Sequence, residues 1–179
     1  MAPRGLATRP TSDRLRETLF NVLAPRMAGA RFLDLYAGSG AVGIEALSRG
    51  AAEVVFVERA PAAVKVLRAN LGGLGIGEGF RIVAGSVAGF LRGVETGPRF
   101  DLVFLDPPYD AADEYEKALG LLGGPAARSL ADGALVVAER RRKDRLDEAY
   151  GGLRRSRVLE QGDAGLSFYG MTETGGENE

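Results

Sequence analysis

Short apolar runs alternate with helical patterns over most of the chain. The runs are rich in Val, Leu and Phe, which is typical of strands that are buried on both faces of a sheet. They occupy residues 31–36, 53–58, 80–84, 100–106 and 133–139. Between the runs, apolar positions at helical spacing predict helices at 41–49, 61–71, 86–93 and 113–131, the last broken at 123–125. This repeated order predicts an α/β, Rossmann-like fold whose mostly parallel sheet carries helices on both faces.

The two ends of the chain show other patterns. Before the first run, helical spacing predicts a helix that Thr11 or Ser12 caps and Pro25 ends. Its apolar positions are Leu15, Leu19, Val22 and Leu23. After the last run we expect a helix near 143–150 and then two strands joined by a turn at 162–165. Strands joined by so short a turn are antiparallel, so the final strand should oppose the rest of the sheet.

The length of 179 residues fits one domain with a single sizeable core. We expect residues 1–30 to form a basic segment and a helix that packs on the core, and 31–170 to form the main domain. Residues 171–179 form a polar tail for which we expect disorder. A monomer is the default assembly for such a chain.

Composition excludes several classes of protein. With 45% hydrophobic and 26% charged residues and no apolar stretch of membrane-spanning length, the chain is typical of a globular protein. No signal peptide is evident, so we expect a cytoplasmic location. The chain has no Cys and no His, which excludes disulfides, thiolate or imidazole metal sites, and Cys or His nucleophiles. We therefore expect no metal, and the chemistry must come from carboxylates, hydroxyls, amides, Arg or a cofactor.

Charge is segregated along the chain although the formal net charge is only −1. Residues 1–31 carry a net charge of +4, and residues 140–157 carry +5. Segregated basic segments can form an anion-facing patch on a nearly neutral protein. The alternative is that residues 139–148, ERRRKDRLDE, are merely a solvated helix face.

A glycine-rich turn follows the first apolar run. Gly38, Gly40 and Gly43 have the G-x-G-x-x-G spacing at the start of a predicted helix, where glycine permits a tight turn and close approach of a ligand. Glu58 ends the second run, 20 residues beyond Gly38, where an acid commonly holds the hydroxyls of a ribose. The pair predicts an adenosine-containing cofactor at the carboxyl ends of the strands.

The spacing alone fits NAD as well as S-adenosylmethionine. Two features favour the methyl donor. Asp34 lies at the end of the first run, where it could pair with the amino-acid portion of that cofactor but would repel a pyrophosphate. The fourth run ends in Asp106, Pro107, Pro108 and Tyr109, which should face the same crevice.

The sequence DLYAGSG, followed by DPPY, resembles the class I methyltransferases that act on exocyclic amino groups. The wider blocks RPTSDRLRETLFNVL, FLDLYAGSGAVGIEALSRGA and FDLVFLDPPY resemble the bacterial 16S rRNA guanine-N2 methyltransferases of the RsmD type. The likeness extends from about Arg9 to Tyr169. It implies a seven-stranded sheet with an antiparallel last strand, and S-adenosylmethionine as methyl donor. It also implies one guanine of 16S rRNA, in an assembling small ribosomal subunit, as the target.

The resemblance extends the expected cofactor site. Ser86 stands after the third run, where the family tends to place an Asp or Asn near the adenine ring, and its hydroxyl can make a hydrogen bond there. The full predicted set is Asp34, Ala37, Gly38, Ser39, Gly40, Gly43, Glu58, Arg59, Ser86, Val87 and Asp106.

The chemistry of an aromatic amine explains the DPPY loop. The lone pair of guanine N2 is delocalised into the ring, so the amine is a poor nucleophile. Asp106 and the carbonyl of Pro107 can accept its two N–H groups and aim the lone pair at the sulfonium methyl. Pro107 and Pro108 stiffen the loop, and Tyr109 offers a flat face on which the base can stack.

The target base must leave its helix or lie in a loop to reach such a crevice. In the block RPTxxRxRE, Arg9, Thr11 and Arg14 could hold phosphate or close over the cofactor. The alternative for these residues is ordinary capping and surface charge. We also expect RNA-backbone contacts, and hence salt-sensitive binding, from Arg140, Arg141, Arg142 and Lys143.

Other functions stay open from the residues alone. Adenine N6 or a protein glutamine amide could be the methyl acceptor, although glutamine methylation typically goes with Asn in the place of Asp106. An NAD-dependent oxidoreductase would need a group such as a Tyr–Lys pair, for which only Tyr115 and Lys117 are close in sequence. A non-catalytic RNA-binding module is a third possibility, which the intact Asp106 and Tyr109 disfavour.

Overall fold

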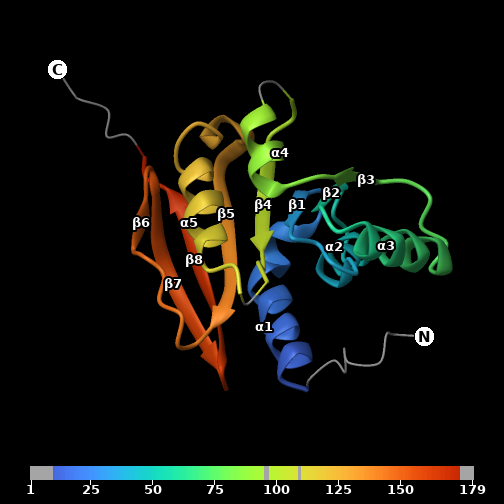
Figure 1. Cartoon of the computed structure of the whole chain (residues 1–179), viewed down its shortest axis with the longest axis horizontal. Helices are drawn as coiled ribbons and strands as arrows, with labels where there is room; N and C mark the ends of the chain where they lie inside the picture. Colours follow the sequence, from blue (N-terminus) through green and yellow to red (C-terminus); the bar gives the residue numbers. More distant parts are fainter. Residues whose placement is uncertain (1–9, 95–96, 109, 174–179) are drawn as a thin grey trace.

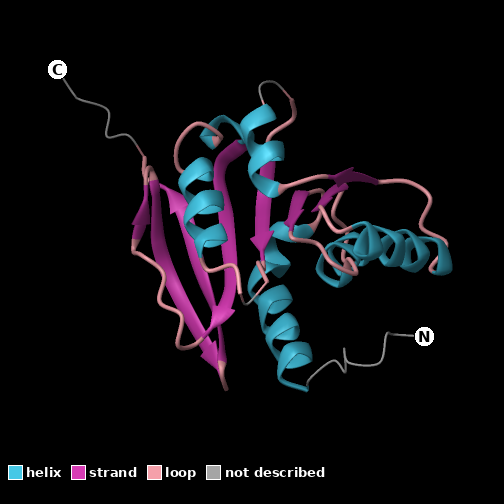
Figure 2. Cartoon of the chain, viewed as in Figure 1, coloured by secondary structure: helices cyan, strands magenta, loops and turns pink. Residues whose placement is uncertain are grey.

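The computed structural model describes residues 10–94, 97–108 and 110–173, and within them it forms one mixed sheet (Figures 1 and 2). The sheet has eight strands in the order β3-β2-β1-β4-β5-β8-β7-β6. Strands β3 to β5 are parallel, and β8 is antiparallel to both β5 and β7. The strands are β1 Arg31–Leu35, β2 Glu53–Glu58, β3 Phe80–Ala84, β4 Phe100–Leu105, β5 Leu130–Arg141, β6 Ala149–Tyr150, β7 Leu153–Gln161 and β8 Ala164–Met171. The predicted fold class, mostly parallel with antiparallel C-terminal strands, is confirmed.

Helices cover both faces of the sheet, as predicted. The helices are α1 Pro10–Met27, α2 Ala41–Ser48, α3 Pro61–Gly73, α4 Val87–Gly93 and α5 Asp113–Leu122, with a 3₁₀ turn, η1, at Ala127–Ser129. The first three pack into one core cluster and the last two into the other. None of the helices within the described ranges combines the length and apolar character that a membrane crossing requires.

Each central strand is apolar on both faces because each face enters a different core. In β4, Leu102 and Phe104 pack on the face covered by α1, whereas Val103 and Leu105 pack on the face covered by α5. Successive side chains of a strand point to opposite faces. The same alternation explains the continuous apolar run that predicts each strand. It also places Asp106, two residues after Phe104, on the face covered by α1.

The structure corrects three predicted elements. No helix forms at 143–150: this segment is a loop leading into β6, which makes eight strands where seven were expected. Here Tyr150 is buried, and its hydroxyl accepts a hydrogen bond from the Asp147 amide at 3.0 Å. These contacts outweigh the local helical pattern. The helix expected at 113–131 ends at Leu122, which confirms the predicted break at 123–125, but only the 3₁₀ turn η1 follows that break, and β5 starts earlier and ends later than 133–139.

Pro25 does not end α1. The helix continues to Met27, whose side chain is buried in the core below it. A proline removes only one hydrogen bond of the helix, and it does so here in the last turn, where a helix tolerates the loss better than in its middle. The chain leaves the helix at Gly29, whose φ of 75° is the left-handed conformation typical of a helix end.

Candidate functional site

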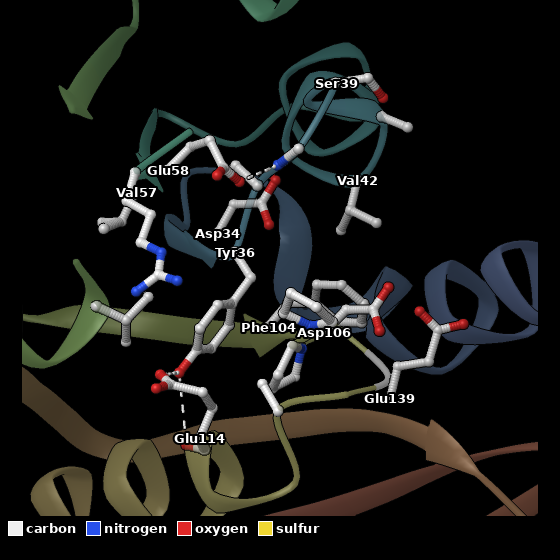
Figure 3. A pocket seen from close by; sticks show the side chains of 18 of the residues that line it. Asp34, Tyr36, Ser39, Val42, Val57, Glu58, Phe104, Asp106, Glu114 and Glu139 are labelled. Atoms are coloured by element: carbon white, nitrogen blue, oxygen red, sulfur yellow. Dashed lines mark hydrogen bonds between the residues drawn. The ribbon is translucent and has the colours of Figure 1, made fainter. Parts of the chain in front are cut away.

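A cavity of about 710 Å³ opens at the carboxyl ends of β1, β2, β4 and β5 (Figure 3). This is where open parallel sheets bind ligands. The acids predicted at three strand ends, Asp34, Glu58 and Asp106, all line it. Helix α1 covers part of the cavity with Ser12, Leu15, Arg16 and Leu19. The central expectation from the sequence, one crevice shared by the three carboxylates, therefore agrees with the geometry.

The loop between β1 and α2 approaches the cavity through its backbone. Gly38 has a φ of 57° and donates its amide to Glu58 Oε2 at 2.8 Å. The second oxygen of that carboxylate accepts the amide of Ala60 at 3.0 Å. Glu58 is thus fixed against the glycine loop at the cavity wall, and each of its oxygens retains a lone pair for a further donor.

Gly40 and Gly43 have a different role from the one predicted. Neither lines the cavity. A Cβ on Gly40 would collide with Leu67, and one on Gly43 would collide with the ring of Phe56. These two glycines therefore let α2 pack closely on α3 and β2, and their predicted contact with a cofactor stays a prediction.

Asp34 is a buried acid. Its side chain is 2% exposed, and its Oδ2 accepts the Gly43 amide at 3.0 Å. Burial raises its pKa to about 8, the Gly43 hydrogen bond opposes this shift, and the negative charge of Glu58 adds to it. A cation placed against this carboxyl would restore its ionised form, so the position suits an ammonium group.

The other predicted cofactor residues lie on the same wall. Ala37, Ser39, Arg59, Ser86 and Val87 all line the cavity. Ser86 caps α4, since its Oγ accepts the Gly89 amide at 3.0 Å. Its hydroxyl hydrogen remains to donate to a ligand.

Asp106 directly follows β4 and faces the cavity (Figure 3), and its side chain is exposed to water although protein atoms surround it. Pro107 and Pro108 line the cavity beside it, and the carbonyl of Pro108 accepts the Ala111 amide at 3.0 Å. Tyr109 lies outside the described residues, so its predicted stacking role stays a prediction. The proline loop is closed by a turn that keeps Asp106 at the strand end.

Glu139 is a site residue that the motifs did not reveal. It belongs to β5, lines the cavity, and turns its carboxyl group toward Asp106 (Figure 3). The negative charge of Glu139 raises the pKa of the Asp106 carboxyl group, so the two groups interact. The signal was available in principle, because Glu139 ends the fifth predicted strand just as Asp106 ends the fourth.

Tyr36 and Glu114 are a second pair that the sequence did not reveal. Tyr36 has a φ of 58°, unusual for a residue with a side chain. Its hydroxyl donates to Glu114 Oε2 at 2.8 Å, which joins the glycine loop to α5 across the cavity (Figure 3). Burial and the negative charge of Glu114 raise the pKa of this hydroxyl, so it stays protonated and donating. No local pattern marks such a contact, because the two residues lie 78 positions apart.

Comparison with known proteins identifies the family of this chain. The model of the family described as conserved hypothetical protein 95 matches residues 1–170. The chain belongs to the conserved hypothetical protein 95 family. It is 37% identical to YlbH of Bacillus subtilis, a candidate rRNA methyltransferase by its name, over 94% of this chain and 90% of that protein. It is 42% identical to the ribosomal RNA small subunit methyltransferase D of Escherichia coli K12, over 76% of this chain and 66% of that protein.

Among solved structures, one described as a candidate methyltransferase of Escherichia coli superimposes with a TM-score of 0.78. It is 36% identical and covers 91% of this chain and 88% of its own. The resemblance to RsmD-type methyltransferases is therefore confirmed, and this member of the conserved hypothetical protein 95 family belongs with the S-adenosylmethionine-dependent methyltransferases. The alternative of an NAD-dependent oxidoreductase has no support in this family. The roles of individual site residues stay predictions.

The residues expected to contact RNA are dispersed. Arg9 lies outside the described residues, as does the side chain of Thr11, whereas Arg14 is exposed on α1. Lys143 is exposed on the loop after β5. In this family member, no three His, Cys, Asp or Glu side chains gather within the described ranges as ligands of a metal ion would.

The structure contradicts the predicted contact of Arg140 with the RNA backbone. Its side chain is 6% exposed, and Nε donates to Ser167 Oγ at 3.1 Å. NH2 contacts Glu160 at 3.3 Å. A guanidinium so enclosed cannot reach an RNA phosphate. Arg141 and Arg142 remain more open but are paired with Asp144 and Glu160, respectively.

Proposed function

We propose that the chain transfers the methyl group of S-adenosylmethionine to the exocyclic N2 of a guanine in small-subunit rRNA. The expected nucleotide is guanine 966 in the usual rRNA numbering. The observation that carries the proposal is that Asp34, Glu58 and Asp106, from three parallel strands, line one cavity. The family membership and the rRNA methyltransferases among its relatives support it.

The residues present fit the cofactor. Glu58 has lone pairs free for the hydroxyls of a ribose, and Asp34 is a buried carboxyl that an ammonium group would ionise. Ser86 and Val87 offer a hydrogen bond and an apolar contact for the adenine. S-adenosylmethionine, when bound, supplies a methyl group on a positively charged sulfur.

The loop after β4 would hold the acceptor. Asp106 accepts one N–H of the amine and the Pro107 carbonyl accepts the other, which turns the nitrogen lone pair toward the methyl group. Positioning of this kind, together with the negative charge of Asp106, lowers the barrier without a histidine base. The cavity cannot admit a duplex, so the guanine must be unpaired or flipped out of its helix.

RNA binding would use the exposed basic residues at the same end of the sheet. Arg14 on α1 and Lys143 after β5 are exposed, so both could contact phosphates. Contacts of this kind make affinity fall with salt concentration. Because many of the other arginines are paired with acids, we expect a modest salt dependence.

The direct test uses small ribosomal subunits, and separately naked 16S rRNA, from a bacterial strain whose own enzyme for this guanine is deleted. The protein is incubated with S-adenosylmethionine, and the nucleosides are analysed by mass spectrometry. The expected product is one N2-methylguanosine per rRNA. An N6-methyladenosine product, or methylation of a protein glutamine in the same particles, would replace the proposed acceptor by one of the alternatives.

A further inference from the structure

The carboxyl pair of Asp106 and Glu139 follows from strand register. In the parallel ladder of β4 and β5, Phe104 pairs with Val137 and Leu105 with Ala138. The next step brings Asp106 beside Glu139. Phe104 and Val137 both pack in the core under α1, so the two acids lie on that same face and point into the cavity (Figure 3).

Two carboxylates that face each other in one cavity repel, so ionising both of them costs free energy. Although the side chain of Asp106 reaches water, the protein atoms around it partly desolvate the carboxyl group and raise its pKa well above the ordinary value. The negative charge of Glu139, then that of Asp34, raises it further. Burial also raises the pKa of Glu139. The pair therefore takes up a proton more readily than two separate acids would and titrates as a unit.

The groups facing Glu139 come from several elements. Arg16 of α1 lowers its pKa, but this guanidinium is shared with Glu45 at 3.0 Å and Asp13 at 3.3 Å. Across the β5–β8 ladder the neighbour is Leu166, which is apolar. From α5, the hydroxyl of Tyr115 donates to the main-chain oxygen of Glu139 at 2.6 Å. Glu139 is thus held in place by its backbone, while its carboxyl group meets Asp106 with only partial charge compensation.

We propose that Glu139 is a positioning residue for methyl transfer: it carries the proton shared with Asp106, and so leaves Asp106 with a bare oxygen directed at the target amine. When the amine gives its proton to Asp106, Glu139 takes up the proton that the pair already shared. This inference rests on the proposed function, because it assigns a second carboxyl group to the same reaction.

Methyl transfer leaves the acceptor nitrogen with one proton to lose. The nitrogen lone pair forms the N–C bond, and the methyl–sulfur bond breaks with its electron pair going to sulfur. The methylated nitrogen, now cationic, gives one proton to the bare oxygen of Asp106. The proton already shared moves fully to Glu139, which releases a proton to water at the cavity mouth, and the pair returns to its single-proton state.

The test compares Glu139→Gln with Glu53→Gln. Glu53 is paired with Arg31 at the opposite end of the parallel strands, so its variant controls for loss of a partly exposed strand glutamate. Gln at position 139 still donates a hydrogen bond to Asp106 but cannot take up a proton. We expect kcat on small subunits to fall roughly 100-fold, the low end of the effect of a positioned proton acceptor, with KM for the cofactor unchanged. The acid limb of the kcat profile should move to lower pH, and Glu139→Asp should recover part of the rate.

A purely structural role would lower thermal stability and shift kcat and KM together, with the pH profile unmoved, and that result overturns the proposal. A wild-type kcat in Glu139→Gln does so as well. Carboxyl ¹³C NMR titration of the substrate-free protein gives an independent readout: Asp106 should titrate in two steps in the wild type and in one lower step in Glu139→Gln. If the wild type methylates no guanine but Asp106 still titrates in two steps, the result contradicts the proposed rRNA methyl transfer and supports the proton shared by Asp106 and Glu139.

Discussion

Charged side chains are arranged differently in the two halves of the sheet. The parallel half is β3, β2, β1, β4 and β5, and the antiparallel half is β5, β8, β7 and β6. In the parallel half all strands end at one edge, so Asp34, Glu58, Asp106 and Glu139 converge on one cavity. Four cationic side chains line it as well, but among the described residues none of them forms an ion pair with these four acids; they are Arg16, Arg59, Arg92 and Lys117. In the antiparallel half, arginines of β5 and the loop after it are paired with acids of β7 and of that same loop. Acids that converge without forming ion pairs mark the first half as the reactive one, whereas the ion pairs of the second half stabilise structure.

The largest expected effect is the loss of the Asp106 charge. Asp106→Asn keeps the shape but removes the anionic acceptor, so we expect kcat to fall roughly 100- to 1000-fold, as for removal of one strong transition-state contact. Cofactor affinity, measured by isothermal titration with S-adenosylhomocysteine, should stay unchanged. The matched control is Asp110→Asn, an exposed acid four residues on that does not line the cavity. Equal loss in both variants would show that the loop, and not the carboxylate, matters.

The second prediction concerns the packing of the glycine turn. Gly43→Ala forces a methyl group into the ring of Phe56, and we expect a loss of roughly 1 to 3 kcal/mol in the free energy of unfolding, the usual cost of overpacking. Gly72 lies in α3 with open space around it, so Gly72→Ala should stabilise by roughly 0.5 to 1 kcal/mol. Urea denaturation followed by circular dichroism measures both. A tolerated Gly43→Ala would contradict the packing role.

The third prediction compares the buried Arg140 with the exposed Arg142. Arg140→Met leaves Ser167, which is fully buried, without its partner, and should cost roughly 1 to 3 kcal/mol of stability. Arg142→Ala removes an exposed side chain and should change stability by less than about 0.5 kcal/mol. Thermal denaturation separates them. A weaker RNA affinity in Arg140→Met at full stability would restore the RNA contact that the structure excludes.

The last prediction is a pH dependence of stability from Asp34. Its pKa in the folded protein is about 8, against an ordinary value of 3.8, so the folded state binds its proton more tightly than the unfolded state does. Its stabilising contribution is complete below about pH 4 and is lost as the pH rises toward 8. Asp34→Asn should flatten this part of the stability profile measured by urea denaturation without cofactor. Saturating S-adenosylhomocysteine, whose ammonium group should ionise Asp34, should flatten it too.

Much of this arrangement could be predicted because it is local. Asp34, Glu58 and Asp106 each follow an apolar run, and parallel strands bring their carboxyl ends together whatever the details of packing. Glu139 satisfies the same rule, but its partnership with Asp106 depends on the register of β4 against β5, which no motif records.

The wrong predictions concern residues whose structure depends on contacts with distant parts of the chain. Whether Arg140 points outward depends on its partner Ser167 on β8, 27 residues away. The local pattern at 143–150 predicts a helix, but long-range contacts decide the structure there, among them the edge-to-face packing of Tyr150 on Tyr169. Long-range pairing overrides local pattern at both places.

The most direct test is the structure of the protein bound to S-adenosylhomocysteine. We predict the ribose hydroxyls at hydrogen-bond distance, about 3 Å, from Glu58, with the ammonium group at Asp34 and the sulfur facing the loop of Asp106 and Pro107. A ligand in another cavity would contradict the account, and so would a sulfur turned away from Asp106.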